Sequence, residues 1–214
     1  MPSKIPRFSR LPASNSIFIH PTAIIEKGVT VHSGTSIWDN VHIRHGASIG
    51  KNCIIGEKSY IAYDVKIGDF VKINSQVYVC TGVTIEDGVM ISAGTVFTND
   101  RYPRAFGPDF KGLAASAPTE HTLSTHVCRG ATIGANATIG PGLEIGEFSM
   151  IGMGSVVTKN VSAFSLVVGN PAKTVGYVCK CGNRVPLRRN KKIRCDRCRT
   201  ALELLNGTLR LAPP

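Results

Sequence analysis

Two features found in many proteins of this length are missing from the sequence: a long apolar run and an export signal. No stretch of the 214 residues approaches the ~20 apolar residues that a membrane-spanning helix needs. The segment Met1–Ser16 contains Lys4, Arg7 and Arg10 but no apolar core of a secretory signal. We therefore expect a cytoplasmic protein that does not enter a membrane.

Acidic residues are scarce, with 14 Asp or Glu against 25 Lys or Arg and a formal charge of +11. Residues 179–214 hold ten of the basic residues and only two of the acidic ones, so the rest of the chain is nearly neutral. Single-stranded nucleic acids stack their bases on aromatic side chains, and the basic tail has none interleaved with its cations. We do not expect a nucleic-acid partner.

One apolar position returns every six residues from Ile19 to Phe97 without a slip. A helix repeats every 3.6 residues and a strand every 2, so neither alone explains this period. A solenoid of short strands does, because each six-residue unit makes one face of a triangular prism and three units make one coil. The residues predicted to point inward are Ile19, Ile25, Val31, Ile37, Ile43, Ile49, Ile55, Ile61, Ile67, Ile73, Val79, Ile85, Ile91 and Phe97.

The period resumes at Val127 and runs to Val157 in the same phase. We therefore predict an all-β solenoid of roughly seven coils over residues 17–178. The stretch at about 98–126 lacks the pattern and is predicted to leave the prism as a loop. A long loop kept on a regular solenoid is typical of a functional site.

The repeated Ile-Gly pattern, as in Ile67-Gly-Asp-Phe-Val-Lys and Ile133-Gly-Ala-Asn-Ala-Thr, resembles the hexapeptide-repeat acyltransferases. This resemblance implies a left-handed parallel β-helix, a homotrimer, and acetyl-CoA bound between subunits. Residues 72–89, 96–105 and 168–173 further resemble the sugar-nucleotide amine N-acetyltransferases. Members of that branch acetylate the 3-amino group of a UDP- or dTDP-linked aminosugar, or of a UDP-linked amino-uronic acid, in O-antigen and other surface-glycan synthesis.

Histidine is absent between His45 and His121. A hydroxyl acceptor needs a positioned base, usually His, whereas a free sugar amine is already a good nucleophile. The gap therefore disfavours O-acyl transfer driven by a base in the middle coils. It also disfavours the γ-type carbonic anhydrases, which share the fold and hold a metal with His residues. His121 and His126, at the end of the loop, stay candidates for reaching a site across a subunit interface.

Amide side chains in the middle coils are the candidate catalytic groups. The eighteen-residue coil predicts one column on the outside of a prism corner: Trp38, Gly56, Asn74 and Ser92. The resemblance assigns catalysis to Asn74 and Gln76, which would hold the amine against the thioester, with Ser75 and Trp38 as substrate contacts. Many relatives read Gln-Asn-Asn at residues 74–76, so which amide faces the substrate stays open. The alternative is that Asn74 only bonds the neighbouring coil.

Cationic side chains in the loop are candidates for substrate binding. Arg101 and Arg104 could grip a diphosphate or a uronate carboxylate with their planar forks, and Asn99 lies beside them in sequence. Arg104 matches a Pro-Arg pair of the family. The alternative is a charged loop that only faces water.

Small turn residues after the loop suit a ligand that lies close to the backbone, and the resemblance places the pantetheine arm of CoA there. Three cations nearby could neutralise its phosphates. The candidate cofactor-binding residues are Arg129, Ala135, Asn136, Met153, Gly154, Lys159 and Lys173.

Two short cysteine pairs, Cys179-Lys-Cys181 and Cys195-Asp-Arg-Cys198, lie thirteen residues apart near the C-terminus. Four thiolates in two such pairs suit tetrahedral Zn²⁺, and a segment too short to bury much core would be stabilised by a metal. We therefore predict a structural zinc ribbon over residues 179–214.

These observations predict an acetyl-CoA-dependent N-acetyltransferase, acting in a homotrimer on a nucleotide-linked aminosugar. Two alternatives remain open: an O-acyltransferase of the same fold, and a non-catalytic solenoid scaffold with a basic zinc ribbon. The sequence does not identify the sugar, the nucleotide carrier, the ring position of the amine or the proton acceptor.

Overall fold

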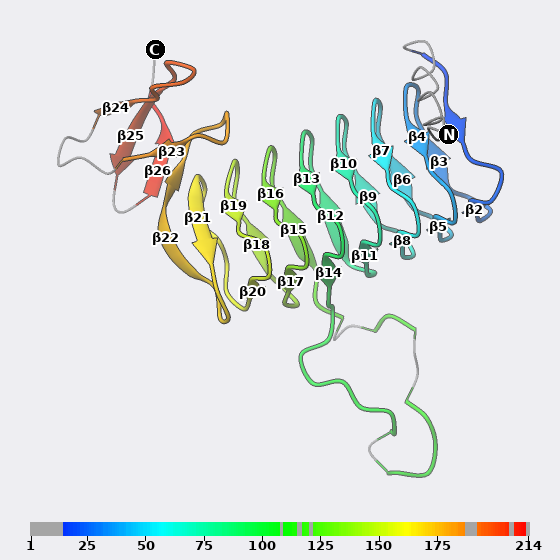
Figure 1. Cartoon of the computed structure of the whole chain (residues 1–214). Coiled ribbons are helices and arrows are strands. Elements are labelled where there is room, and N and C mark those ends of the chain that lie inside the picture. The colour runs from blue at the N-terminus through cyan, green and yellow to red at the C-terminus, as the bar shows by residue number, and fades with distance from the viewer. Residues whose placement is uncertain are drawn as a thin grey trace, which may run out of the picture.

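The computed structural model describes residues 15–107, 109–114, 117–119, 122–186, 192–205 and 208–212. These residues form a β-solenoid that is extended by a small antiparallel sheet at its C-terminal end (Figure 1). The described residues contain no helix, and hence none that could cross a membrane. The predicted all-β solenoid is confirmed.

Three sheets of parallel strands make the three faces of the prism, and each strand pairs with strands one coil before and after it. Face A comprises β1 (Phe18–Ile19), β4 (Ser36–Ile37), β7 (Ile54–Ile55), β10 (Lys72–Ile73), β13 (Met90–Ile91), β16 (Thr132–Ile133), β19 (Met150–Ile151) and β21 (Ser165–Val168). Face B comprises β2 (Ile24–Ile25), β5 (His42–Ile43), β8 (Tyr60–Ile61), β11 (Tyr78–Val79), β14 (Val96–Phe97), β17 (Thr138–Ile139) and β20 (Val156–Val157). Face C comprises β3 (Thr30–Val31), β6 (Ser48–Ile49), β9 (Lys66–Ile67), β12 (Val83–Ile85), β15 (Thr125–Val127) and β18 (Glu144–Ile145).

The inward residue of each unit stacks on its equivalents in the next coils. Ile73 pairs with Ile55 and with Ile91, and all three side chains are fully buried. Burial of such a side chain stabilises the fold by about 1.5–3 kcal/mol. Ile19 differs, because it is 42% exposed in the first coil, which no earlier coil of the described chain covers. The six-residue pattern thus identifies the core except at its open end.

The long loop leaves face B after β14 and returns to face C at β15, and it projects from the side of the prism (Figure 1). The backbone N–H of Leu123 donates to the carbonyl of Asn99 at 3.0 Å, so the two ends of the loop lie together. On its return the chain pairs Val127 with Ile85, in the phase that the sequence predicts. The loop therefore adds to one face without disturbing the stack.

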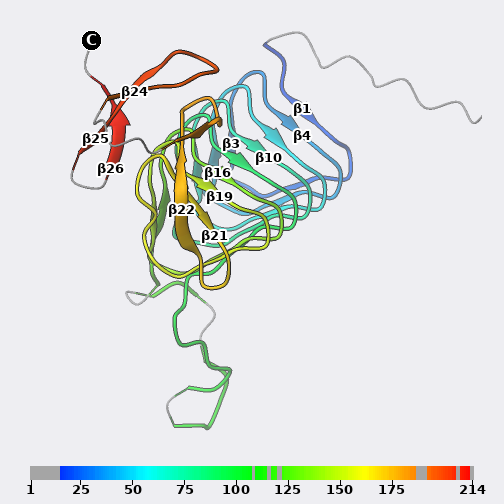
Figure 2. The ribbon, with the colours of Figure 1, turned by 60° about the vertical axis from the view of Figure 1, so that its left-hand side comes forward.

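The C-terminal segment continues face A before it forms its own sheet. Strand β22 (Lys173–Val178) turns back antiparallel to β21, and β23 (Arg184–Val185) pairs with β22. A separate sheet follows, made of β24 (Lys192–Arg194), β25 (Ala201–Leu205) and β26 (Thr208–Leu211), which lies beside the last coils in both ribbon views (Figures 1 and 2). We call the described residues from 179 onward the ribbon.

Candidate functional site

The turns between face A and face B form one edge of the prism, the A–B edge, and it carries most of the predicted catalytic and CoA-binding residues. Successive turns are joined by backbone N–H···O bonds of 2.8–3.0 Å, from Lys58 to Asp39, Gln76 to Glu57, Gly94 to Ser75, Asn136 to Ala93 and Gly154 to Ala135. The edge therefore brings into one line Trp38, Asn74, Ser75, Gln76, Ala135, Asn136, Met153 and Gly154.

Asn74 bonds its neighbouring coils through its backbone. Its N–H donates to the carbonyl of Ile91 at 2.8 Å, and its carbonyl accepts from the Ser59 hydroxyl at 3.0 Å. The half-buried Asn74 side-chain amide has no hydrogen-bond partner within the described part of the chain, and the same holds for the exposed amide of Gln76. Both amides are therefore available to a ligand.

Part of the A–B edge is packed so closely that the glycines at residues 56 and 134 have no room for a side chain. A Cβ at Gly56 would lie 2.6 Å from the carbonyl carbon of Asn74, and one at Gly134 would lie 2.5 Å from the nitrogen of Met153. Gly154, by contrast, faces open space, and Met153 is 82% exposed. The later end of the edge thus presents accessible backbone to a thin ligand.

Trp38 lies on the same edge but two coils before Asn74, about 10 Å away at the ~4.8 Å spacing of paired strands. Its ring packs on Phe18 with centroids 5.6 Å apart. In a single chain Trp38 therefore covers the first coil.

The three cations predicted to meet CoA phosphates lie away from the A–B edge. Arg129 occupies the edge between faces C and A, where it ion-pairs with Glu147 at 3.2 Å. Lys159 follows β20 on the edge between faces B and C, and Lys173 lies opposite Val168 in β22. One chain does not bring these three side chains together.

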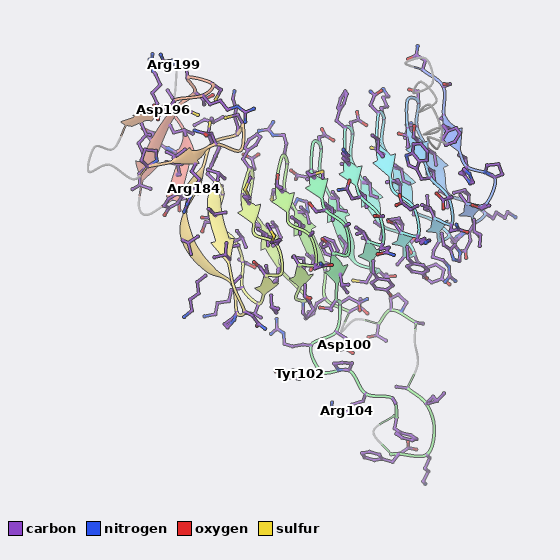
Figure 3. The ribbon with its side chains drawn as sticks, viewed as in Figure 1. Asp100, Tyr102, Arg104, Arg184, Asp196 and Arg199 are labelled. Carbon is purple, nitrogen blue, oxygen red and sulfur yellow. The ribbon has the colours of Figure 1, made fainter. Side chains whose placement is uncertain are left out.

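A cavity of about 1080 Å³ lies between face B and the long loop. Asn99 and Arg104 line it, but Arg101 does not. The Asn99 side chain donates to the carbonyl of Thr81 at 3.1 Å and so fixes the base of the loop. Arg104 lies exposed on the part of the loop that projects beyond Asp100 (Figure 3).

Sequence reasoning missed the aromatic residues in the cavity wall. The rings of Tyr60 and Tyr78 stack with centroids 5.3 Å apart and planes 9° from parallel. Arg44 donates to the Tyr60 hydroxyl at 2.6 Å, ion-pairs with Glu26 at 2.6 Å, and lies 4.1 Å from the ring centre of Tyr63. The signal was in the sequence, because two tyrosines eighteen residues apart occupy equivalent positions in successive coils.

The family model described as bacterial transferase hexapeptide (six repeats) matches residues 28–62, 64–99 and 124–159, which together make up half of the chain. The chain belongs to this family. A second model, hexapeptide repeat of succinyl-transferase, matches residues 46–80. Both models fall on the coils and leave out the projecting part of the loop.

Curated relatives match only part of this chain, and the chain spans well under two thirds of their own length. A dTDP-3-amino-3,6-dideoxy-α-D-galactopyranose 3-N-acetyltransferase from Aneurinibacillus thermoaerophilus is 45% identical over 69 residues, which cover 32% of this chain and 36% of that protein. Serine acetyltransferase 4 of Arabidopsis thaliana is 34% identical over 84 residues, 39% of this chain and 23% of that protein. Among solved structures, the Vibrio cholerae hexapeptide-repeat acetyltransferase VCA0836, complexed with acetyl-CoA, is 25% identical over 62% of this chain and 70% of its own, with a TM-score of 0.49.

The hexapeptide repeats do not account for the ribbon, where the four cysteines gather as predicted. Their Sγ atoms all lie within 4.8 Å of one another, with Cys179 and Cys198 3.5 Å apart and Cys181 and Cys195 3.7 Å apart. Tetrahedral zinc with bonds of ~2.3 Å would place its sulfurs about 3.8 Å apart, so this cluster fits the ion. Hydrogen bonds from Thr200 lower the pKa of Cys198 to about 6, whereas burial raises the pKa of Cys179 to about 12.

A Glu–His pair occurs twice on the outside of the hexapeptide prism. His126 Nε2 lies 2.7 Å from Glu86 Oε1, and Glu86 Oε2 accepts from the Arg129 N–H. His42 Nε2 lies 3.1 Å from Glu26 Oε1 in the same arrangement. Hydrogen bonding from His126 lowers the pKa of Glu86 below its usual value. Because the arrangement recurs, we interpret it as a device that joins successive coils.

Proposed function

We propose that this chain is an acetyl-CoA-dependent N-acetyltransferase that acts on the 3-amino group of a UDP- or dTDP-linked aminosugar. It would work in the cytoplasm as a homotrimer and supply surface-polysaccharide synthesis such as that of O-antigen. The observation that carries the proposal is the A–B edge, where the unpartnered amide of Asn74 lies in line with the open backbone at Met153 and Gly154. The 45% identity to a dTDP-3-aminosugar N-acetyltransferase supports it.

In the proposed reaction the lone pair of the sugar amine attacks the thioester carbonyl, the C–N bond forms and the C–S bond breaks. The Asn74 side-chain oxygen would accept a hydrogen bond from the amine and hold it in line for attack. A backbone N–H of the edge would stabilise the developing oxyanion. The departing CoA sulfur takes up one proton, and the amine loses one, so the step is balanced.

Amine acetylation is favoured over hydroxyl acetylation because the A–B edge holds no histidine from Trp38 to Gly154. Of the two Glu–His pairs, Glu86 and His126 lie on face C and its border with face A, whereas His42 lies on face B, two coils before Tyr78. A hydroxyl acceptor remains the second candidate, because serine acetyltransferase 4 is 34% identical to part of this chain.

The four cysteines would hold one structural Zn²⁺ in this enzyme. The ion would join the start of the ribbon to its separate sheet, because Cys179 follows β22 directly whereas Cys195 and Cys198 lie beyond β24. It would take no part in acetyl transfer.

The first experiment measures thiol release from acetyl-CoA against a panel of UDP- and dTDP-aminosugars, including the 3-amino uronate, with free serine as the hydroxyl acceptor. We expect turnover on one aminosugar and none on serine. Turnover on serine alone would contradict the proposal and support the hydroxyl acceptor.

Asn74→Ala should lower kcat about 10- to 100-fold, because the amine is no longer positioned. Asn74→Asp keeps the acceptor oxygen and should retain more turnover than Asn74→Ala. Melting temperature and trimer content serve as controls for folding. Unchanged kcat in Asn74→Ala would remove Asn74 from the mechanism.

A further inference from the structure

The outer side of face B carries a ladder of rings that stops partway along the prism. Strand register stacks His42, Tyr60 and Tyr78 in successive coils, and the next position is Val96. Tyr60 covers one face of the Tyr78 ring, while Val96, on the other side, is too small to cover the second. Tyr78 is accordingly 43% exposed. A planar ring of a ligand could therefore stack on the uncovered face of Tyr78, on the side of Val96.

We call the stacked rings of Tyr60 and Tyr78 the aromatic platform, and contacts within the chain hold it in place without a ligand. The guanidinium of Arg44 bonds the Tyr60 hydroxyl at 2.6 Å and is itself held by Glu26, also at 2.6 Å. Because Tyr60 is fixed in this way, Tyr78 stacks on a fixed neighbour. A preordered surface loses little conformational entropy on binding, which favours affinity.

The cavity beside the platform offers polar groups suited to a nucleotide. The carboxylate of Asp64 and the side-chain oxygen of Asn99 can accept from the N–H groups of a base, since the Asn99 nitrogen is already used on Thr81. Glu26 takes up the charge of Arg44, so Arg104 is the cation available to a diphosphate. At about 1080 Å³ the cavity is large enough for a drug-sized ligand.

The platform also connects directly to the proposed catalytic amides. Tyr78 follows Gln76 by two residues in the same coil, and the coil then runs across face B to Thr81 in the cavity wall. At ~3.3 Å per residue, Gln76 and Thr81 are separated by at most about 16 Å. An acceptor lying across face B could place its amine at the A–B edge and its nucleoside in the cavity.

We infer that the cavity binds the nucleoside diphosphate end of the acceptor, with the pyrimidine base stacked on the free face of Tyr78. This inference rests on the proposed function, but it concerns binding and does not require acetyl transfer. It makes Tyr78 a residue that determines acceptor affinity through its ring face and not through its hydroxyl.

The test is titration calorimetry of the 214-residue chain with UDP and with dTDP, each without CoA. We expect the wild type to bind at least one of them, and Tyr78→Ala to bind it about tenfold or more weakly, because a stacked base is lost. Tyr78→Phe keeps the ring face and should bind within about twofold of the wild type. Phe70→Asn is the matched control: it removes an exposed ring from another edge, at a φ of 56° that Asn tolerates.

The outcomes separate this inference from the proposed function. Wild-type protein that binds neither diphosphate, or Tyr78→Ala that binds as tightly as the wild type, would overturn the inference, even if acetyl transfer to an aminosugar is found. Tyr78-dependent binding without transfer to any aminosugar would support the site and overturn the proposed function. A Tyr78→Ala protein that changes its oligomeric state in sedimentation would show that the ladder is a contact between copies of the chain, and would also overturn the inference.

Discussion

The prism and the ribbon reach stability in different ways. The prism stacks one inward aliphatic residue on another through successive coils, and from Ile37 to Ile145 most of these side chains are fully buried. The buried cluster of the ribbon is small: among the described residues it comprises Cys179, Val185, Ile193, Cys195, Leu202 and Leu209, which pack with Phe164 of the last coil. Two of its members belong to the four-cysteine group. Repetition supplies the apolar burial of the prism, whereas the ribbon would gain stability from the proposed metal cross-link.

Removal of the proposed metal should give the largest effect and should be confined to the ribbon. Structural zinc sites in small peptides contribute apparent binding energies of ~10–16 kcal/mol, so a strong chelator should unfold the ribbon. Hydrogen exchange should then accelerate in the ribbon and stay slow in the coils between Val127 and Val157. Cys195→Ser should reproduce the effect.

The matched control for the metal experiment is Cys53→Ser. Cys53 is fully buried in the prism, and its thiol lies 3.1 Å from the carbonyl of Gly68. This variant should keep the full metal content, as measured by atomic emission. A folded wild-type protein that contains no zinc after purification and takes none up would refute the metal.

A truncation in the apolar core should destabilise the prism and leave the four-cysteine cluster unchanged. Ile91→Ala removes buried methyl groups from the stack and should lower the free energy of unfolding by about 2–5 kcal/mol. Val96→Ala, on the outside of the same coil and 39% exposed, should cost less than about 1 kcal/mol. Urea denaturation followed by circular dichroism measures both. If both variants lose the same free energy of unfolding, Ile91 does not point inward while Val96 points outward.

The period of six predicted the inward residues, the prism and the phase of the chain after the loop, because burial acts on every repeat alike. It also predicted the column that contains Trp38 and Asn74. The grouping of Arg129 with Ala135 as CoA-binding neighbours does not hold within one chain, because the two residues lie one face apart on different edges. Face assignment follows from counting units, and that count would have separated them.

The six-residue period did not predict the contacts that the loop makes, because the loop itself has no period. The cavity, the role of Asn99 in holding Thr81, and the pairing of Arg44 with Glu26 depend on how outward side chains meet across coils. Asn99 and Thr81 are eighteen residues apart, as are Arg44 and Glu26, so the coil count brings each pair into register. Which side-chain atoms then bond depends on three-dimensional packing, which the count does not give.

Close stacking of the A–B edge predicts a smaller, local effect. In Gly56→Ala the new Cβ would lie 2.6 Å from the Asn74 carbonyl carbon, so the turn at Asn74 must move. Overpacking of this kind costs about 1–3 kcal/mol. Gly112→Ala is the control, because a Cβ there meets nothing within 4 Å. If both variants unfold at the same urea concentration, the edge is looser than the structure indicates.

The Glu86–His126 pair should give the smallest effect, and its pH dependence identifies it. The pKa of Glu86 is lower in the folded than in the unfolded chain. The contribution of its carboxylate to folding stability is therefore fully present above the unfolded pKa of ~4.3 and is lost as the pH falls through the folded pKa. Glu86→Gln should therefore lower the free energy of unfolding at pH 7 by about 1 kcal/mol or less, as a half-exposed pair does, and by progressively less as the pH falls through the folded pKa. A loss at pH 3 equal to that at pH 7 would show that the side chain acts through packing and not through its charge. A loss well above 1 kcal/mol at pH 7 would mean that surface pairs, and not the apolar stack alone, hold the coils together.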